Sequence, residues 1–210
     1  MRIQPMSTAR DEDLAADCCI IGSGPAGLTV ARELVASGFD VLLLESGGID
    51  PDPSADALNA SESIGAPREP DDEQKRNRIL GGTSHTWSGR AVVFDPIDFA
   101  VRPWVPHSGW PVSRASLEPY FERSREHLGA PVADNDDADF VRTVTAGTPP
   151  LDPQKLEPYA WALSQDAADP GDSMRFGPRA VAEPMPGVRA LSSATVVGIE
   201  VSADLSLIHI

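Results

Sequence analysis

The sequence predicts an α/β protein built around a parallel sheet, and three observations lead to this fold class. The short apolar run at 17–21 ends in a glycine, which is typical of a buried parallel strand. After it, Leu28, Ala31, Leu34 and Val35 fall on one face of a predicted helix, which Gly38 ends. A second apolar run at 40–45 follows directly and ends in an acid. Strand, helix and strand in this order form the unit from which parallel sheets are assembled.

The glycines after the first strand have the spacing of a nucleotide-binding turn. Gly22 allows the tight turn, Gly24 lets the backbone approach a pyrophosphate, and Gly27 lets the helix sit close to the sheet. Spaced glycines also occur in βαβ crossovers that bind nothing, but here a strand, a helix and a second strand surround them as a binding turn requires. The predicted Rossmann-like site therefore includes the whole turn: Gly22, Ser23, Gly24, Pro25, Ala26 and Gly27.

The acid at the end of the second strand, Glu45, indicates the class of nucleotide. A carboxylate at this position accepts hydrogen bonds from ribose hydroxyls and would repel a phosphate on the ribose. We therefore expect the turn to bind an adenine dinucleotide, with Glu45 and Ser46 as cofactor-binding residues. On this stretch alone the dinucleotide is FAD or, as the alternative, NAD.

A second glycine-rich segment, RNRILGGTSHTWSGR, spans residues 76–90. Its paired glycines leave backbone amides that can face a phosphate or a flavin ring, and Thr83 and Ser84 add hydroxyl groups. Taken alone, this segment would be interpreted as a surface turn.

Several motifs together resemble the glucose–methanol–choline (GMC) oxidoreductases. They are the nucleotide turn with small residues at Ala31 and Gly38, then RILGGTSHTWSGR, FDPIDF and SGWPVSRASLEPYFERSREHLG, in the same order and at similar spacing. The resemblance implies FAD as the cofactor and is closest to the sugar-oxidising members, including the pyranose oxidases. It also implies a set of residues that line the flavin and pyrophosphate or contact adenine: Gly81, Gly82, Thr83, Ser84 and, through its backbone, Val196. Thr86 and Trp87 depart from the commonest family signature.

The resemblance implies an oxidoreductase that removes hydride from the CH–OH group of a sugar or other alcohol and transfers it to flavin N5, with oxygen or another molecule as electron acceptor. In that family the catalytic histidine lies far downstream. The chain is therefore expected to be the N-terminal FAD-binding fragment of a longer enzyme, inactive alone and without catalytic residues of its own.

Two alternatives to this function stay open. One is an FAD- or nucleotide-binding module without turnover. The other is a different FAD enzyme class, an aromatic hydroxylase or a disulfide reductase. A disulfide reductase would need two redox cysteines a few residues apart, whereas Cys18 and Cys19 are adjacent.

His85 bears on how the cofactor is held. Several GMC enzymes attach FAD covalently through a histidine four positions after the second glycine, where this chain has Thr86. His85 comes one residue earlier, and a one-residue offset in an extended loop turns a side chain toward the opposite face. We therefore predict non-covalent FAD, with His85 either hydrogen-bonded locally or near the flavin ring without a bond to it.

The predicted organisation has five segments. They are a flexible N-terminus (1–13), a first part of the FAD-binding domain (14–130), an excursion toward the substrate domain (131–186), two return strands (187–201) and a tail suspected to be non-native (202–210). Residues 113–129 predict a helix that is capped by Ser113, broken near Pro119 and closed by Gly129. The aromatic residues Trp161 and Phe176 are interpreted as packing residues.

Composition argues against several classes of partner. The chain has 210 residues and a net charge of −15, which argues against nucleic acid. No apolar run is long enough to span a membrane and the N-terminus lacks the apolar stretch of a signal peptide, so we expect a cytoplasmic protein. The two cysteines point to opposite faces of their strand, which excludes a disulfide framework and argues against a metal site.

Overall fold

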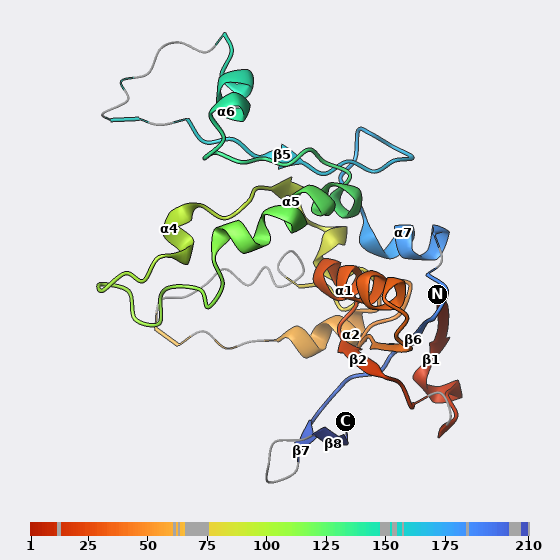
Figure 1. Cartoon of the computed structure of the whole chain (residues 1–210). Helices are drawn as coiled ribbons and strands as arrows, with labels where there is room; N and C mark the ends of the chain where they lie inside the picture. Colours follow the sequence, from red (N-terminus) through yellow and green to blue (C-terminus); the bar gives the residue numbers. More distant parts are fainter. Residues whose placement is uncertain are drawn as a thin grey trace. The chain divides into compact units, whose positions relative to one another are not determined.

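The computed structural model divides the chain into two compact units (Figure 1). The first unit comprises Met1–Trp87 and Arg175–Ile210, and the second comprises Ser88–Met174. The structure describes residues 1–11, 14–60, 62, 64–65, 76–147, 152, 155–156, 158–183, 185–201 and 207–209. The chain thus leaves the first unit after residue 87, inside the segment predicted as the FAD-binding domain. The functional assignment of the predicted segments stays a prediction.

A four-stranded parallel sheet forms the centre of the first unit. Its strand order is β1 (Arg2–Pro5), β6 (Val188–Ser192), β3 (Val41–Leu44) and β2 (Cys18–Ile21). Val41 is in register with Cys18 of β2 on one side and with Val188 of β6 on the other. The predicted α/β fold with a parallel sheet is confirmed, and both predicted strands of the glycine motif are present.

Helix α1 (Pro25–Ala36) connects β2 to β3. Two residues of its predicted apolar face, Leu28 and Ala31, are buried, and the other two, Leu34 and Val35, are half-buried. Gly38 follows the helix with φ +90°, a conformation that side chains other than glycine rarely adopt, so it ends the helix as predicted. The central strands supply the rest of this core, with Val41, Leu43, Val188 and Leu191 at most 1% exposed.

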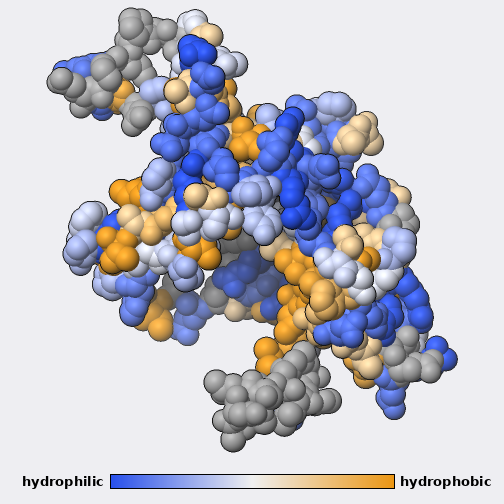
Figure 2. Space-filling view, in the orientation of Figure 1, coloured by the Kyte–Doolittle hydropathy of each residue, from blue (hydrophilic) through white to orange (hydrophobic). Residues whose placement is uncertain are grey.

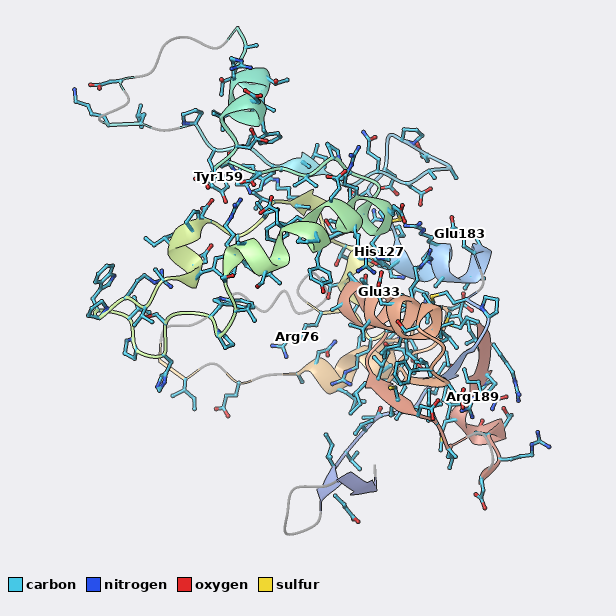
Figure 3. The ribbon with its side chains drawn as sticks, in the orientation of Figure 1. Glu33, Arg76, His127, Tyr159, Glu183 and Arg189 are labelled. Atoms are coloured by element: carbon cyan, nitrogen blue, oxygen red, sulfur yellow. The ribbon has the colours of Figure 1, made fainter. Side chains whose placement is uncertain are left out.

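The edge strand β1 lies in the stretch predicted to be flexible. It pairs with β6 in the register Arg2↔Arg189, so the sheet extends to the N-terminus of the chain. The tetrapeptide RIQP has no apolar alternation, and its pairing partner is far along the chain, so local periodicity does not reveal the strand. Arg189, which is labelled in Figure 3, also donates to Asp40 Oδ2 at 2.6 Å and to the carbonyl of Ala15, and these bonds tie β6 to the segments preceding β3 and β2.

The segment after β6 differs from the predicted pair of return strands. Residues 193–199 carry no regular secondary structure. In the described part of this segment, the next strand is β7 (Glu200–Val201), which pairs antiparallel with β8 (Leu207–His209). Most of the tail suspected to be non-native, 202–206 and 210, lies outside the described residues.

Short helices complete the first unit. They are the single turns η1 (Met6–Thr8), η3 (Ala57–Asn59) and η4 (Gly82–His85), the four-residue α2 (Pro53–Asp56), and α7 (Phe176–Ala182), which precedes β6. The turn η4 contains the second glycine-rich segment.

The second unit contains little sheet. Strands β4 (Arg90–Ala91) and β5 (Ala162–Leu163) pair antiparallel, and the helices are α4 (Pro96–Phe99), α5 (Arg114–Leu128) and α6 (Ala138–Val144). Its small apolar core consists of Ala130, Ala133 and Ala162 with Val92, Leu128 and Phe140 packed against them.

Helix α5 begins and ends where the sequence predicts. Ser113 caps it by accepting a hydrogen bond from the Ser116 amide, and Gly129 closes it with φ +60°. The predicted break near Pro119 is wrong, because the helix runs through this residue. A proline removes a single N–H from the helical ladder, and the bonds on either side of it are enough to continue the helix here.

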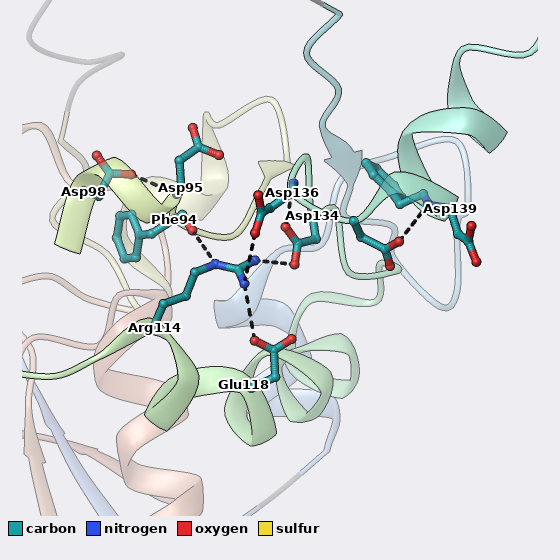
Figure 4. A network of polar contacts seen from close by, with 10 residues as sticks. Phe94, Asp95, Asp98, Arg114, Glu118, Asp134, Asp136 and Asp139 are labelled. Carbon is teal, nitrogen blue, oxygen red and sulfur yellow. Dashed lines mark hydrogen bonds and ion pairs between the residues drawn. The ribbon is translucent and has the colours of Figure 1, made fainter. Parts of the chain in front are cut away.

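An ion-pair network fastens the start of α5 within the second unit (Figure 4). The Arg114 guanidinium donates to Asp134 and to the carbonyl of Phe94, and it lies 3.6 Å from Glu118 and 3.8 Å from Asp136. Its side chain is only 19% exposed. Burial acts to lower the pKa of Arg114, but the hydrogen bond and charge of Asp134, together with the charges of Glu118 and Asp136, outweigh it and raise the pKa. This cation is therefore permanent and holds the loop at 134–136 to the helix.

Hydrophilic residues cover much of the face shown in Figure 2, with smaller apolar patches between them, as expected for a chain with a net charge of −15. Within the described residues, no helix combines the length and the apolar character needed to cross a membrane.

Candidate nucleotide-binding site

The predicted nucleotide turn connects β2 to α1. Gly22 has φ +94° and donates its N–H to the Leu44 carbonyl at 2.8 Å, which places the turn beside the end of β3. A Cβ on Gly27 would lie 2.0 Å from the Gly22 carbonyl oxygen, so the fold itself requires glycine at 27. Gly24 is different: its φ of −64° suits any residue, and the space where its Cβ would stand is open. The fold does not require Gly24, and the open space beside it suits a ligand.

The N-terminus of α1 faces this turn. Gly24 is the N-cap residue and provides no side-chain cap for the first turn, in which Pro25 and Ala26 stand. Uncapped amides at a helix N-terminus bind anions because the helix dipole adds positive potential there. The predicted residues Pro25, Ala26 and Gly27 thus form the start of a twelve-residue helix with the geometry of a phosphate site.

Glu45 and Ser23 form a buried pair at the edge of the turn. Glu45 Oε2 accepts hydrogen bonds from the Ser23 backbone N–H at 2.9 Å and from the Ser23 hydroxyl at 2.5 Å. Glu45 Oε1 accepts from the Gly47 N–H at 2.9 Å. The side chains are nearly inaccessible, with Ser23 0% and Glu45 6% exposed. Because a carboxylate offers about four acceptor positions, Glu45 retains room for about one further hydrogen bond, and that position is on Oε1.

The segment after Glu45 is held by Arg78. A Cβ on Gly47 would lie 1.8 Å from the Arg78 carbonyl oxygen, and the Leu80 N–H donates to the Gly48 carbonyl at 2.9 Å. The Arg78 guanidinium also donates to the hydroxyl of Ser46 at 2.8 Å. The predicted cofactor segments 45–46 and 81–84 are therefore held next to each other by the contacts of Ser46, Gly47 and Gly48 with Arg78 and Leu80.

The segment that contains Val196 is hydrogen-bonded to Glu45 and Ser46. The Ala194 N–H donates to the Glu45 carbonyl at 2.8 Å, and the Thr195 hydroxyl bonds the Ser46 hydroxyl at 2.8 Å. Val196 lines a cavity of about 700 Å³ on the face of the sheet that Leu42 and Leu44 line. Its volume falls within the range of small-molecule sites. The cavity also contains Cys19, and burial raises the pKa of this thiol.

The glycine pair of the second segment packs against the first glycine turn. Gly81 and Gly82 have φ of +94° and +53°, and a Cβ on Gly82 would lie 3.0 Å from Gly24 Cα. The Gly81 N–H lies 3.1 Å from the carbonyl and 3.2 Å from the hydroxyl of Ser23, 58 residues away in sequence. Ser23 thus connects the first glycine turn both to Glu45 and to the second glycine segment. Spacing alone marks it as a turn residue and does not reveal this role.

The hydroxyl residues after the glycine pair are not equivalent. Ser84 is 1% exposed, and its hydroxyl donates to the Gly81 carbonyl at 2.7 Å and accepts from the Phe176 N–H at 3.0 Å. Thr83 is half-buried. The Ser84 hydroxyl is therefore occupied in holding the loop, which leaves Thr83 as the hydroxyl residue better placed to face a ligand.

The hydrogen bond of His85 has the local character that the sequence predicts. Its Nε2 lies 2.8 Å from the Leu80 carbonyl oxygen. Because a carbonyl oxygen only accepts, this nitrogen carries the proton and donates.

The start of α7 also belongs to the site region, although no local pattern in the sequence indicates it. Arg175 donates to two loop carbonyls, Phe176 bonds Ser84, and Gly177 packs against the loop so closely that a Cβ there would lie 1.9 Å from the Leu80 carbonyl oxygen. The Phe176 ring also meets Trp87 edge-on at 6.0 Å, in agreement with its interpretation as a packing residue. Pro178 in the first turn marks a helix start, but nothing local links that helix to a loop about 90 residues earlier.

Comparison with known proteins identifies the domain. Residues 20–50 match the family described as NAD(P)-binding Rossmann-like domain. Relatives by sequence are the 6'''-hydroxyparomomycin C oxidase of Streptomyces lividus (31% identity over 54% of this chain and 23% of the relative) and the paromamine 6'-oxidase of Streptomyces fradiae (33% over 57% and 24%). A 2-methyl-1,2-propanediol dehydrogenase of Mycolicibacterium austroafricanum is 28% identical over 72% of this chain and 30% of the relative.

Among solved structures, pyridoxine 4-oxidase from Mesorbium loti shares the fold, with a TM-score of 0.50 and 18% identity over 90% of this chain and 44% of the other. The chain spans about a quarter of the length of the curated relatives it matches. The glycine turn lies inside the matched Rossmann-like segment, and the sequence relatives are oxidases and a dehydrogenase. The chain therefore carries a Rossmann-like nucleotide-binding domain and is a relative of oxidoreductases of the glucose–methanol–choline type.

Proposed function

We propose that the first unit binds FAD without a covalent bond and that the protein oxidises the CH–OH group of a sugar or other alcohol. The observation that carries the proposal is the meeting of two glycine segments. Gly82 packs on Gly24 beside the N-terminus of α1. The fold does not require glycine at position 24, and the space beside it is open. A backbone surface of this kind admits a pyrophosphate closely, and a second glycine segment beside it suits a cofactor longer than a mononucleotide.

Each part of such a cofactor has a matching group in this chain. The first-turn amides of α1 fit the pyrophosphate, and the remaining acceptor position on Glu45 Oε1 fits a ribose hydroxyl. Gly82 and Thr83 fit the flavin side, with Gly81 and Ser84 supporting them. Val196 lines an apolar cavity that offers space for adenine. Neutral ribose hydroxyls, and not a ribose phosphate, suit the carboxylate of Glu45.

FAD, when bound, supplies the acceptor for a hydride from the alcohol carbon. The residues of this chain bind and orient it. Ser23 holds Glu45 in place and fixes the second glycine segment, while α1 offsets the charge of the pyrophosphate. We assign no general base in this chain and expect that proton transfer depends on residues outside it.

The substrate class follows from the relatives. Two of them are named as oxidases of paromamine and of a hydroxyparomomycin, which are sugar-like compounds, and one as the dehydrogenase of a small diol. We therefore infer a sugar-like or small alcohol as substrate. The acceptor is oxygen or another oxidant, since the relatives include both oxidases and a dehydrogenase.

The test begins with titration of the purified full-length protein by FAD, by NAD and by ADP. We expect FAD to bind more tightly than NAD, and acid precipitation to leave the yellow flavin in the supernatant. Adding paromamine or a small diol without oxygen should then bleach the flavin band if the protein carries its catalytic part. Tighter binding of NAD than of FAD would contradict the proposal that FAD is the cofactor. Flavin retained by the precipitate would contradict the proposal that FAD is bound without a covalent bond. FAD binding without bleaching by any alcohol would favour a binding module without turnover.

A further inference from the structure

Arg175 stands where the chain re-enters the first unit. Its backbone is extended, with φ −105° and ψ 108°, and it is the N-cap residue of α7. From this position the guanidinium Nη1 donates to the carbonyl of Ser84 at 2.8 Å and to that of His85 at 2.6 Å. These bonds span about 90 residues of sequence, so Arg175 fastens the second glycine segment to a distant part of the chain.

The residues after Arg175 extend this attachment. The Phe176 N–H donates to the Ser84 hydroxyl at 3.0 Å, and a Cβ on Gly81 would lie 2.2 Å from the Gly177 nitrogen. Both residues are buried. Helix α7 therefore backs the whole segment from Gly81 to His85, and Arg175 brings a charged donor to two of its carbonyls.

The position of the two carbonyls explains what Arg175 does to the loop. Ser84 and His85 end the single helical turn η4, where carbonyl groups lack partners inside the helix and carry partial negative charge. A guanidinium satisfies both at once. The opposite end of the turn begins at Gly82, which packs on Gly24 of the nucleotide turn. By holding the carbonyls at the end of η4, Arg175 thus fixes the position of its first residue, Gly82, against the nucleotide turn.

We propose that Arg175 is a positioning residue for the flavin half of the cofactor. This inference rests on the proposed function, in which Gly82 and Thr83 face the flavin side. The adenosine half is held separately, because the side chain of Glu45 is fixed by Ser23 and Gly47. Loss of Arg175 should therefore weaken FAD much more than ADP, which has no flavin.

The experiment compares Arg175→Met and Arg175→Lys with the wild-type full-length protein. Binding of FAD and of ADP is measured by titration, and the environment of the flavin ring by its visible circular dichroism. Arg175→Met should weaken FAD about 10- to 100-fold, as expected when charged hydrogen bonds are lost, and change the dichroism, while ADP affinity stays within about twofold. Lysine keeps the charge and should restore part of the FAD affinity. Arg179→Met is the matched control, because it removes an arginine of the same helix that pairs with Glu183 at 2.9 Å.

The outcomes separate this inference from the proposed function. A wild-type protein that bound no FAD would overturn both. A wild-type protein that binds FAD, together with an Arg175→Met variant of equal affinity and dichroism, would overturn the role of Arg175 alone. A parallel loss of FAD and ADP would do the same, since it would mean a general loss of structure. If methionine prevents folding, the lysine variant decides by the same ratio of FAD to ADP affinity.

Discussion

The two glycine segments that meet at the candidate site are built in different ways. The turn at Gly22–Gly27 is held by β2, α1 and β3, all within the first 45 residues. The segment at Gly81–His85 has its carbonyls and its Ser84 hydroxyl bonded to α7, which follows in sequence only after the whole second unit. A contiguous motif is thus enough to shape the first segment, whereas the second depends on the return of the chain.

The same contrast appears inside the first turn. Gly27 is required because its missing Cβ leaves room for the Gly22 carbonyl, so it serves the fold. Gly24 has ordinary backbone angles and open space beside it, so by our proposal it serves the ligand. Substitution of Gly27 should therefore lower the stability of the fold, whereas substitution of Gly24 should weaken ligand binding and leave the stability nearly unchanged.

The largest effect is expected for Gly27→Ala. Its Cβ would lie 2.0 Å from a backbone oxygen that cannot move without opening the turn. The free energy of unfolding should fall by at least about 3 kcal/mol, or the protein should not fold. Gly24→Ala is the control and should change it by less than about 1 kcal/mol. Chemical denaturation measures both variants, and equal stability of the two would remove the distinction between these glycines.

The next effect concerns the buried acid. Glu45→Gln leaves at least one of the donors on Ser23 and Gly47 facing an amide NH₂ group. We expect a loss of about 2–4 kcal/mol in the free energy of unfolding, because a buried donor then lacks its acceptor. Glu122→Gln, on the exposed side of α5 where Glu122 is 67% exposed, should cost less than about 0.5 kcal/mol. Equal losses in the two variants would show that Glu45 has no special structural role.

A smaller effect is expected for Ser23→Ala. The variant removes the hydroxyl that joins Glu45 to the second glycine segment but leaves both backbone bonds of residue 23. The free energy of unfolding should fall by about 1–3 kcal/mol. Ser37→Ala removes an exposed hydroxyl that bonds the Glu33 carbonyl at the other end of α1 and should be nearly neutral. If Ser23→Ala added its full cost on top of Glu45→Gln, the two side chains would not be coupled.

The smallest effect is expected at the end of α7. Glu183 is 52% exposed, and hydrogen bonding to Arg179 lowers its pKa. A lowered pKa in the folded state means that the pair stabilises the protein above the pKa of an unfolded glutamate and loses this contribution as pH falls through the folded pKa. Glu183→Gln should therefore cost at most about 0.5 kcal/mol near neutral pH and nothing in acid. A cost that persists in acid would contradict an electrostatic origin.

The part of the fold that the sequence predicts is the part encoded locally. The sequence correctly predicts strand, turn, helix and strand over residues 17–45, because periodicity and glycine spacing act over a few residues. Strand β1 and the return of α7 to the second glycine segment were missed, because each depends on a partner far along the chain. The break predicted at Pro119 was wrong, because a single lost hydrogen bond does not end a capped helix.

The roles of individual site residues show the same limit. The sequence groups Thr83 and Ser84 as equivalent hydroxyl residues, and only the contact with Phe176 distinguishes them. It groups Ser23 with the other turn residues, although the hydroxyl of Ser23 joins Glu45 to Gly81. The spacing of residues in the sequence predicts which segments form the candidate site. Which of their residues face a ligand and which hold the loops in place depends on hydrogen bonds between distant residues, and spacing does not reveal these.

The most direct test of the central claim is the FAD affinity of Gly24→Val, measured by titration of the full-length protein beside the wild type. A branched side chain at 24 would fill the open space where we place the pyrophosphate, without meeting any atom of the protein at its Cβ. Gly171→Val in the second unit is the control, since the atom nearest its added Cβ is the Asp169 carboxylate oxygen at 3.2 Å. The account predicts that Gly24→Val folds normally and binds FAD about 100-fold more weakly, a loss of about 2.7 kcal/mol. A folded Gly24→Val variant with wild-type FAD affinity would contradict it.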